Sequence, residues 1–590
     1  MSGPVRRTVD ALNALSVFGA DQEGAYREHS QAVREALGED VPTVLSGYLR
    51  GWAEEGAPGA VVLTGNAGTG KTALAEAFAV ACGARLPDSD GLEEIAAGRF
   101  VVKDLSGLGE HDRSRVAGLA VEIQEGRREA QLLLCANEGM LRATLEAAGP
   151  AGVLRPVDDA LRSGLGREER LLVINMNRQR WTAPDTWHAL LDYLTRSERW
   201  GPCDGCGESQ ECPLRRNAEA LRSSGPREAV RLLVQAASGG GVVTLRELLA
   251  ALSHAITGGR TCDDVQSALG RGELFDASAG YFHQLFGPSL RPDQIESSPL
   301  MQALREIGVG TSADLQVDEW LRDAGSAPSE VRRLSEDEGV HGRVRTQVGP
   351  MTVAALGELI TISDDAVAVE KCLADLAEGR QFLVLWRRRV FFEAPMLLGG
   401  RAATFRRLSR RPSFGGLLDL VEALQSARST AEARARIVTG MNFLAAGYHS
   451  YRGQLVVPDA GSLAARDPGS FRLPTPSLVH SEVPVERIRL RLAEAPELAD
   501  FLDIDQVGAV LSVARDGKPP LELALTPRLY QAVADSADFR APVGSDIPEM
   551  TELELFYSRL GLERAEAGLH VVDPHIQAIR RVTLPELGNA

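Results

Sequence analysis

The sequence predicts an α/β fold with a mostly parallel sheet, and three observations support this prediction. Short apolar runs that end in polar residues recur through the first third of the chain. The segments that contain them are 61–63, 99–107, 131–139 and 170–179. Stretches of helical character separate them, as at 72–81 and around Val116, Leu119, Ala120 and Ile123. A glycine-rich loop joins the first run to the first of these helices. Alternation of strand and helix is typical of a parallel sheet covered by helices.

The glycine-rich loop has the sequence GNAGTGKT and matches the pattern G-x-x-x-x-G-K-[ST]. Its residues are Gly65, Asn66, Ala67, Gly68, Thr69, Gly70, Lys71 and Thr72. Glycines permit backbone angles at which successive N–H groups point at phosphate oxygens, and the following helix adds the positive end of its dipole. We expect Lys71 to reach the β- and γ-phosphates and Thr72 to bind Mg²⁺. The sequence therefore predicts a P-loop nucleotide-binding core with ATP and Mg²⁺ as cofactors.

A nucleotide hydrolase also needs an acid near magnesium and a polar sensor near the γ-phosphate. In a first arrangement, Asp104 ends the acid-bearing strand and binds Mg²⁺ with Thr72, while Asn137 is the sensor. Asp104 closely follows its apolar run, and CANEGMLR is typical of the end of a sensor strand. Against this arrangement, the chain from Lys71 to Asp104 is short and no glutamate stands beside Asp104.

In a second arrangement, the run before Asp104 is an ordinary strand and Glu138 is the acid that activates water. Asn175 or Asn177 is then the sensor. The longer chain between Lys71 and Glu138 favours this arrangement. Asn137 counts against it, because an aspartate normally stands there to help hold magnesium. Both arrangements remain open at this point, and each acid also has the plainer alternative of capping a helix.

The order of strands and helices over residues 45–200 resembles the AAA+ branch of P-loop nucleotide hydrolases. Four arginines follow the sensor candidates: Arg142, Arg155, Arg162 and Arg178. Each is a candidate for a finger that reaches the nucleotide of a neighbouring subunit, and the alternative for each is an ordinary solvated arginine. We expect the active protein to be a homo-oligomer.

Composition and charge argue against several classes of protein. The 590 residues are 44% apolar and 25% charged, as in a globular protein of several domains. The net charge of -17 argues against binding nucleic acid through the overall field. No apolar run is long enough to span a bilayer, and no apolar stretch follows Arg6 and Arg7 as a secretion signal requires. We expect a cytoplasmic protein without a membrane partner.

A cysteine cluster follows the nucleotide-binding region. Cys203, Cys206 and Cys212 form a C-x2-C-x5-C array among turn-forming glycines and prolines. This knuckle spacing lets two thiolates face one tetrahedral ion, and Cys262 is the first candidate for a fourth ligand, with His254 the second. The sequence predicts a structural Zn²⁺ site, with an iron–sulfur cluster or a group of inert thiols as alternatives.

Four regions are predicted along the chain. They are an N-terminal helical segment (1–44), the P-loop domain (45–200), a helical domain with the cysteine cluster (201–330) and a C-terminal α+β or helical recognition module (331–590). Within the third region, TLRELLAALSHAIT predicts a helix that Thr244 caps and Gly258 ends.

The segment Arg387–Arg411 is a basic exception in an acidic chain. Its arginines are Arg387, Arg388, Arg389, Arg401, Arg406, Arg407, Arg410 and Arg411. Interleaved aromatic residues make it a candidate for contact with a nucleic-acid backbone, with some base stacking. The alternative is a helical face whose arginines pair with acids of this chain or contact an acidic partner.

Several segments together resemble prokaryotic defence ATPases. They are LTGNAGTGKT, VVKDLS, LLCANEGML, CPLRRN, TLRELLAALSHAITGGRTC and RRRVFFE. Over residues 60–460 the chain is similar to the ATP-binding restriction component of DNA phosphorothioation-dependent systems. This resemblance implies an ATPase that works on DNA with partner proteins of the nuclease or helicase type.

Three functions follow from these observations. The first is an ATPase subunit of a restriction-type defence system that couples ATP to remodelling of DNA or of partners. The second is a regulatory switch with little turnover, whose nucleotide state gates a partner effector. The third is a scaffold in which nucleotide and metal only stabilise the fold.

Overall fold

The computed structural model of this chain divides into two compact units. The first comprises Met1–Glu306, Leu315–Ala394 and Ala495–Asp505, and the second comprises Ile307–Asp314, Pro395–Glu494 and Gln506–Ala590. The residues that the structure describes are 4–18, 32–33, 35–38, 41–86, 89, 91–148, 151–201, 203, 206–208, 210–239, 241–273, 275, 277–322, 327–336, 366–446, 454–458, 478–493, 496–504, 508–538, 548–561, 569–573 and 578–582.

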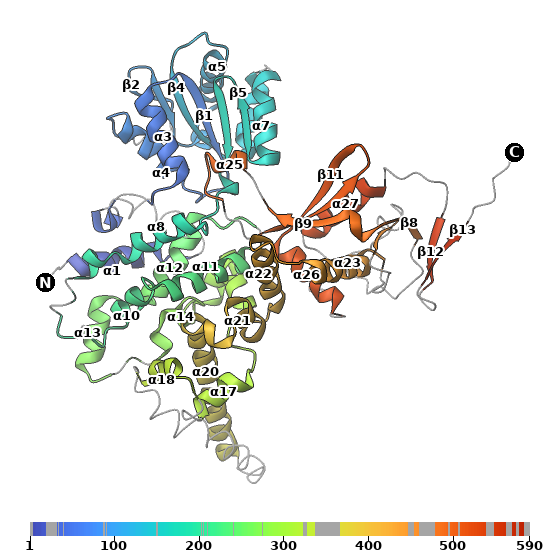
Figure 1. Cartoon of the computed structure of the whole chain (residues 1–590). Helices are drawn as coiled ribbons and strands as arrows, with labels where there is room; N and C mark the ends of the chain where they lie inside the picture. Colours follow the sequence, from blue (N-terminus) through green and yellow to red (C-terminus); the bar gives the residue numbers. More distant parts are fainter. Residues whose placement is uncertain are drawn as a thin grey trace. The chain divides into compact units, whose positions relative to one another are not determined.

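The first unit contains a six-stranded, mostly parallel sheet (Figure 1). Its strands are β1 (Gly59–Thr64), β2 (Glu93–Ala96), β3 (Arg99–Val102), β4 (Gln131–Ala136), β5 (Leu165–Glu168) and β6 (Leu171–Asn175). The strand order is β2-β3-β4-β1-β6-β5. Strands β3, β4, β1 and β6 run parallel, and only the edge strands β2 and β5 are antiparallel to their neighbours.

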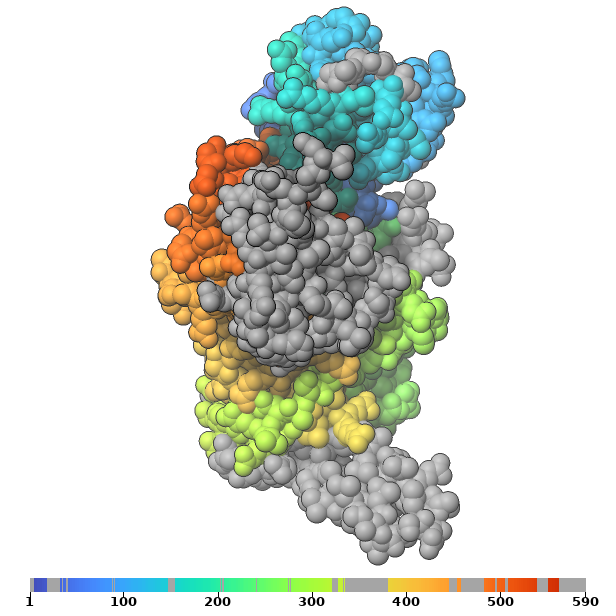
Figure 2. Space-filling view, turned by 90° about the vertical axis from the view of Figure 1, so that its right-hand side faces the viewer, coloured from blue at the N-terminus to red at the C-terminus, as the bar shows by residue number. Residues whose placement is uncertain are grey.

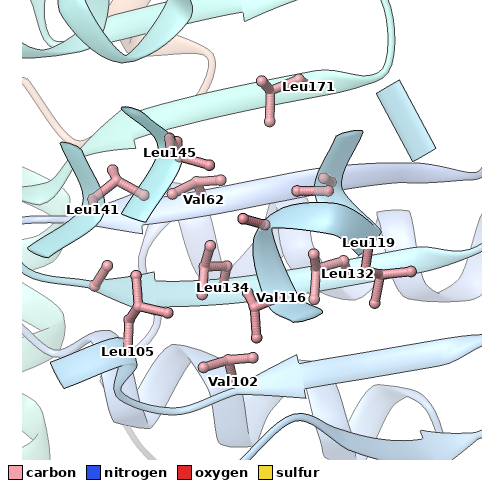
Figure 3. Packing of buried hydrophobic residues seen from close by; sticks show 14 of the residues in the cluster. Val62, Val102, Leu105, Val116, Leu119, Leu132, Leu134, Leu141, Leu145 and Leu171 are labelled. Carbon is pink, nitrogen blue, oxygen red and sulfur yellow. The ribbon is translucent and has the colours of Figure 1, made fainter. Parts of the chain in front are cut away.

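One face of this sheet is covered by α5 (Glu110–Gln124), α6 (Glu138–Ala148) and α7 (Ala151–Ser163). Figure 3 shows how Val116 and Leu119 of α5 and Leu141 and Leu145 of α6 pack onto strand residues such as Leu134. These helices lie on the surface of the unit, pale blue to teal in Figure 2. They are amphipathic because only one side of each helix meets the strands.

The other face is covered by α3 (Val44–Glu55), α4 (Lys71–Ala81) and the distant segment 496–504. Trp52 of α3 and Phe78 of α4 stack with ring centroids 5.1 Å apart. With helices on both faces, β1 and β4 are buried along their whole length. The two faces complete a three-layer α/β/α arrangement, which confirms the predicted α/β core with a mostly parallel sheet.

Helices make up the rest of the described first unit. They are α1 (Pro4–Leu15), α8 (Pro184–Thr195), α9 (Ser197–Trp200), α10 (Pro213–Ala220), α11 (Ser224–Ser238), α12 (Leu245–Thr257), α13 (Cys262–Gly270), α14 (Tyr281–Gln284), α15 (Pro292–Glu296), α16 (Pro299–Ile307), α17 (Leu315–Arg322), α18 (Ser329–Glu336) and α20 (Ala366–Glu393). The prediction for α12 is confirmed in detail. Thr244 and Glu247 form a capping box, and Gly258 ends the helix in the left-handed conformation at φ 56°.

Helix α20, which follows the predicted region boundary at 330/331 in the chain, belongs to the first unit. Its residues Trp386, Phe391 and Phe392 are buried, and the indole of Trp386 donates to the carbonyl of Val317 over 2.9 Å. This apolar packing attaches α20 to α17, which precedes it in the described chain.

The described part of the second unit combines helices with two antiparallel sheets, as an α+β arrangement requires. The sheets have the orders β11-β10-β9 and β13-β12-β8-β7. The elements are α21 (Arg401–Leu408), α22 (Pro412–Gln425), α23 (Ala431–Ala446), β7 (Leu455–Pro458), β8 (Leu478–Val483), β9 (Ile488–Leu492), β10 (Ala509–Arg515), β11 (Lys518–Leu525), α26 (Pro527–Ala537), α27 (Pro548–Gly561), β12 (Leu569–Asp573) and β13 (Ala578–Val582).

Among the described residues, no helix is both long enough and apolar enough to cross a membrane.

Candidate functional site

The polar candidates from the sequence lie at one edge of the sheet. In the strand register, Thr64 of β1 is level with Ala136 of β4 and with Asn175 of β6. Val102 of β3 is level with Leu134 of β4, so Asp104 follows β3 at the same edge. The carboxyl ends of parallel strands are where open α/β sheets bind ligands. The glycine loop, which follows β1, therefore lies beside the loops after β3, β4 and β6.

At two positions the glycine loop has a backbone conformation that glycine adopts more easily than other residues. Gly68 and Gly70 have φ angles of 79° and 92°, in the left-handed region. Thr69 between them is buried, and its hydroxyl donates to the carbonyl of Asn66 over 2.9 Å. Helix α4 begins at Lys71, and the Thr72 side chain is exposed. The Thr72 side chain is thus open to a ligand.

Lys71 folds back over the loop. Its ammonium donates to the carbonyls of Gly65 over 2.7 Å and of Asn66 over 2.8 Å. Burial lowers the pKa of Lys71; the nearby Asp104 carboxylate raises it and Arg246 lowers it. The Lys71 charge is therefore held directly above the loop, near an acid from the next loop.

The N-terminus of α12 packs against the glycine loop. The N–H of Arg246 donates to the carbonyl of Gly68 over 3.2 Å. A Cβ added at Gly68 would lie 3.1 Å from the Cβ of Arg246, and one at Gly70 would lie 3.6 Å from Leu245 Cδ2. Sequence reasoning did not identify Arg246 as a site residue, because nothing in TLRELLAAL shows that this helix returns to a loop so far back in the chain.

The loop after β6 holds the glycine loop from the other side. The Asn66 N–H donates to Asn177 Oδ1 over 2.9 Å, and Asn177 Nδ2 donates to Asn66 Oδ1 over 3.3 Å. Asn175 is buried, and its Oδ1 accepts from the Asn177 N–H over 3.0 Å, capping the short helix η2 (Met176–Arg178). Asn175 thus shapes this loop, while Asn177 contacts the glycine loop directly.

The loops after β3 and β4 are joined to each other. Asp104 is half-buried and caps η1 (Leu105–Gly107) by accepting from the Ser106 N–H over 2.9 Å. Asn137 Nδ2 donates to the Ser106 hydroxyl over 2.8 Å, while Asn137 Oδ1 accepts from the Met140 N–H. Because β4 lies between β1 and β3, this linkage places Asn137 and Asp104 on neighbouring loops beside the glycine loop.

Glu138 lies in different surroundings. It is exposed in the first turn of α6 and interacts electrostatically with Arg142 on the same helix. Together with Arg142, Asp158, Leu161 and Arg162 it lines an open hollow formed by α6 and α7. The structure therefore groups Asp104 with Lys71 and groups Glu138 with the arginines of α6 and α7.

The four candidate finger arginines lie on the first unit near these helices. Arg142 pairs with Glu146 at 2.9 Å, and Arg155 lies 3.9 Å from Asp159. Arg178 donates to the backbone carbonyl of Arg162 over 3.1 Å. The Arg155 side chain is 80% exposed, which matches the alternative of a solvated arginine.

The four cysteines predicted as metal ligands lie near enough to one another to interact electrostatically. The N–H of Cys206 donates to the Cys203 carbonyl over 2.9 Å, and Gln266 of α13 donates to Cys206 Sγ over 3.7 Å. Burial raises the pKa of Cys262 to about 12, and the Cys212 and Cys203 thiols also act to raise it. His254 lies elsewhere, between the Ser16 and Ser289 hydroxyls at 3.2 Å and 3.3 Å.

These cysteine side chains are not arranged around a common point as metal ligands are. Within the described ranges, no group of three or more His, Cys, Asp or Glu side chains is arranged to hold a metal ion. The chemistry of four cysteines without disulfides fits zinc, but their side chains must close together to bind it. The zinc site remains a prediction.

The zinc prediction has a direct measurement. We expect about one zinc per chain in the purified protein by elemental analysis, because four thiolates complete a tetrahedral site. Chelation should lower the melting temperature, since structural zinc contributes to folding. Replacing Cys206 and Cys262 with Ser should remove the metal, whereas Cys82→Ser, outside the cluster, should retain it. Protein that contains neither zinc nor iron would rule the site out.

The arginine-rich segment is largely engaged inside the protein. Arg387, Arg388 and Arg389 are 6%, 9% and 8% exposed. Arg387 makes two hydrogen bonds of 2.7 Å to Asp318, and Arg389 pairs with Glu393 at 3.0 Å. Buried side chains cannot follow a nucleic-acid backbone, so these three arginines are not placed for the contact that the sequence suggests.

Further arginines of this segment also have partners within the chain. Arg407 makes two hydrogen bonds of 2.7 Å to Asp314, and Arg406 pairs with Asp419. Arg410 donates to the Thr311 hydroxyl over 3.0 Å. These contacts are those of the alternative interpretation, in which the arginines pair with acids of this chain.

Comparison of the chain with protein-family models, with curated proteins and with solved structures gives no match.

Proposed function

We propose that this chain binds Mg²⁺-ATP at residues Gly65–Thr72 and hydrolyses it. The observation that carries this proposal is the position of Lys71 over the glycine loop, at the carboxyl edge of the sheet and near Asp104. A half-buried ammonium held by two neutral carbonyls gains a stronger partner when phosphate arrives, because the phosphate oxygens carry negative charge and add direct attraction between opposite charges to the hydrogen bonds.

Each residue of the site has a proposed role. Backbone N–H groups of the loop and the α4 N-terminus bind phosphate oxygens, and Lys71 moves to the β- and γ-phosphates. Thr72 and Asp104 hold Mg²⁺, which neutralises charge that develops on the γ-phosphate. Asn137 contacts the attacking water or the γ-phosphate. These roles correspond to the AAA+-like arrangement in which Asp104, rather than Glu138, is the acid.

A nucleotide-gated switch with slow turnover is the second candidate. The observation that favours it is Leu105, which is buried and stands directly after Asp104, where a water-activating glutamate would be expected. The pairing of the basic segment with acids of this chain also favours a switch that acts on a partner protein over a motor that follows DNA. In this case the chain holds ATP for long periods and its bound state gates an effector.

Binding and turnover distinguish these candidates. Isothermal titration with ATP in the presence of Mg²⁺ measures binding, and release of inorganic phosphate measures hydrolysis. An ATPase is expected to turn over at about 1 s⁻¹ or faster, within the usual range of enzymes, whereas a switch binds ATP with much slower release. A chain that binds neither ATP nor another nucleoside triphosphate would contradict both candidates.

Arg246 gives a prediction specific to the packing of α12 on the loop. We propose that its guanidinium contacts the γ-phosphate, because its backbone is fixed at Gly68 and it interacts electrostatically with Lys71. Arg246→Ala should lower kcat/KM for ATP about tenfold to a hundredfold, the value of one charged hydrogen bond. Arg271→Ala, at the exposed end of α13, is the matched control. Equal kinetics in the two variants would remove Arg246 from the site.

We further propose, from the sequence resemblance, that the chain is the ATP-binding subunit of a prokaryotic DNA-defence system. In this role it works in the cytoplasm as a homo-oligomer, with a nuclease or helicase as partner. Co-purification of such a partner, and a change in ATP turnover when the partner and DNA are added, are the expected results. If adding the partner and DNA leaves the rate of ATP turnover unchanged, the defence role is contradicted, while the proposal of ATP binding is unaffected.

A further inference from the structure

A segment from late in the chain packs against the strands and loops that carry the candidate nucleotide site. Strands β9 and β10 are antiparallel neighbours, and the Ala493 N–H donates to the Gly508 carbonyl over 3.0 Å at their open end. Between these two residues the chain leaves the three-stranded sheet of the second unit. Its described part, 496–504, which includes α25 (Pro496–Ala499), belongs to the first unit.

Apolar side chains anchor this segment in the core behind the glycine loop. Leu498, Phe501 and Leu502 are buried in the cluster that contains Leu63 of β1 and Met176 of η2. The ring of Phe501 also meets that of Tyr48 on α3, edge to face, with centroids 5.0 Å apart. The segment therefore replaces part of the helical layer on this face of the sheet.

Asp503 makes a dense set of hydrogen bonds to the loop after β6. Gln179 Nε2 donates to Asp503 Oδ2 over 2.7 Å, and the Asp503 N–H donates to Gln179 Oε1 over 3.1 Å. The Arg180 N–H donates to the Asp503 carbonyl over 3.0 Å, and the Val44 N–H donates to Oδ2 over 3.3 Å. Gln179 and Asp503 are both buried, so the bonds between them are shielded from water.

A short stretch of chain connects this pair to the residue that contacts the glycine loop. Gln179 stands two residues after Asn177, which exchanges two hydrogen bonds with Asn66. Asn66 and Gly65 are also the residues whose carbonyls hold the Lys71 ammonium. If Lys71 turns to a phosphate, both carbonyls lose that partner, so the proposed nucleotide binding changes the contacts of residues 65–66.

We infer that Gln179 and Asp503 are positioning residues for the glycine loop. We also infer that, through this pair, nucleotide binding changes hydrogen exchange in strands β9 and β10. The inference rests on the proposed nucleotide binding. The element with two states is the Lys71 ammonium, bound either to the loop or to phosphate. Coupling between two sites is reciprocal, so a change at β9 and β10 alters nucleotide affinity as well.

Exchanging the amide and carboxylate of this pair tests the inference in the full-length chain. Gln179→Glu places a second carboxylate against Asp503 and removes the donor of the 2.7 Å bond. Asp503→Asn alone keeps an oxygen acceptor for Gln179 and should be mild. In the double variant the new amide at position 503 donates to the new carboxylate at position 179, which restores the pair and loses only the longer bond from Val44. Gln425→Glu, at the exposed end of α22, controls for added charge.

The readouts are affinity for Mg²⁺-ATP and hydrogen exchange in peptides covering 488–492 and 509–515. In the parent protein, saturating ATP should change exchange in these peptides. Gln179→Glu should weaken ATP binding about tenfold and abolish the exchange response at saturation, and the double variant should recover both. Gln425→Glu should behave like the parent.

The outcomes separate failure of the inference from failure of the proposed function. If ATP binds the parent without changing exchange in β9 and β10, or if Gln179→Glu responds like the parent, the inference is wrong and nucleotide binding stands. If Gln179→Glu loses ATP affinity and the exchange response, and the double variant regains neither, the pair only stabilises the fold. The inference is again wrong in that case. If the parent binds no ATP, the proposed function fails and the inference fails with it.

Discussion

Lys71→Ala is expected to abolish ATP hydrolysis and to weaken ATP binding while leaving the fold intact. The Lys71 ammonium bonds to oxygens of the loop, at 2.7 Å and 2.8 Å from the Gly65 and Asn66 carbonyls. With ATP bound it is the group placed to neutralise charge on the β- and γ-phosphates. Removing one preorganised donor of this kind costs a factor of about a hundred or more in turnover.

The chain should still fold in this variant because other bonds hold the loop, although residues 65–66 lose their contacts with Lys71. The Thr69 hydroxyl donates to the Asn66 carbonyl, and Asn177 accepts from the Asn66 N–H. The melting temperature is therefore expected to change little. Phosphate release and nucleotide titration measure the effect, with Lys518→Ala on β11 as the control for loss of an exposed lysine. Unchanged turnover in Lys71→Ala would overturn the proposed nucleotide site altogether.

The sequence predicts those parts of the site whose structure is determined by residues close together in the chain. Strand β1, the glycine loop and α4 follow one another directly, so apolar run, glycine pattern and helix formers are all visible in one stretch. The capped helix α12 is visible for the same reason, since Thr244, Glu247 and Gly258 act on their own helix. The edge strands β2 and β5 are short and only partly buried, with the sequences EEIA and LGRE, and give no apolar signal.

The parts that the sequence does not reveal depend on tertiary packing. Arg246 and Asp503 reach the site from distant stretches of chain, and their own neighbours carry no sign of it. The sequence reveals the positive charge of the run Arg387–Arg389, but it does not reveal which residues these arginines contact. Asp318, Glu393 and the ring of Phe286, which lies 3.9 Å from the Arg388 guanidinium, turn this run into a buried face of α20.

The order of strands in the sheet decides which acid is better placed, and no pattern in the sequence states that order. Strand β4 lies between β1 and β3, so Asn137 at the end of β4 is next to the glycine loop and Asp104 is one loop further. The Ser106 hydroxyl joins Asn137 to the Asp104 loop over 2.8 Å. Glu138, although adjacent to Asn137 in the chain, starts α6 and lines the hollow between α6 and α7 with Arg142.

Asp104→Asn and Glu138→Gln therefore form a matched pair, since each replaces a carboxylate by an amide of the same shape. We expect Asp104→Asn to lower turnover on the order of a hundredfold or more, because it weakens Mg²⁺ binding and removes the carboxylate nearest the reacting phosphate. Glu138→Gln should remain within about twofold of the parent, as a substitution on an exposed helix turn does. Phosphate release at saturating Mg²⁺-ATP measures both, and raising Mg²⁺ should partly restore Asp104→Asn if its loss lies in metal affinity. The reverse result, a steep loss in Glu138→Gln with ATP still bound and little effect in Asp104→Asn, would make Glu138 the water-activating acid and return the sensor role to Asn175 or Asn177.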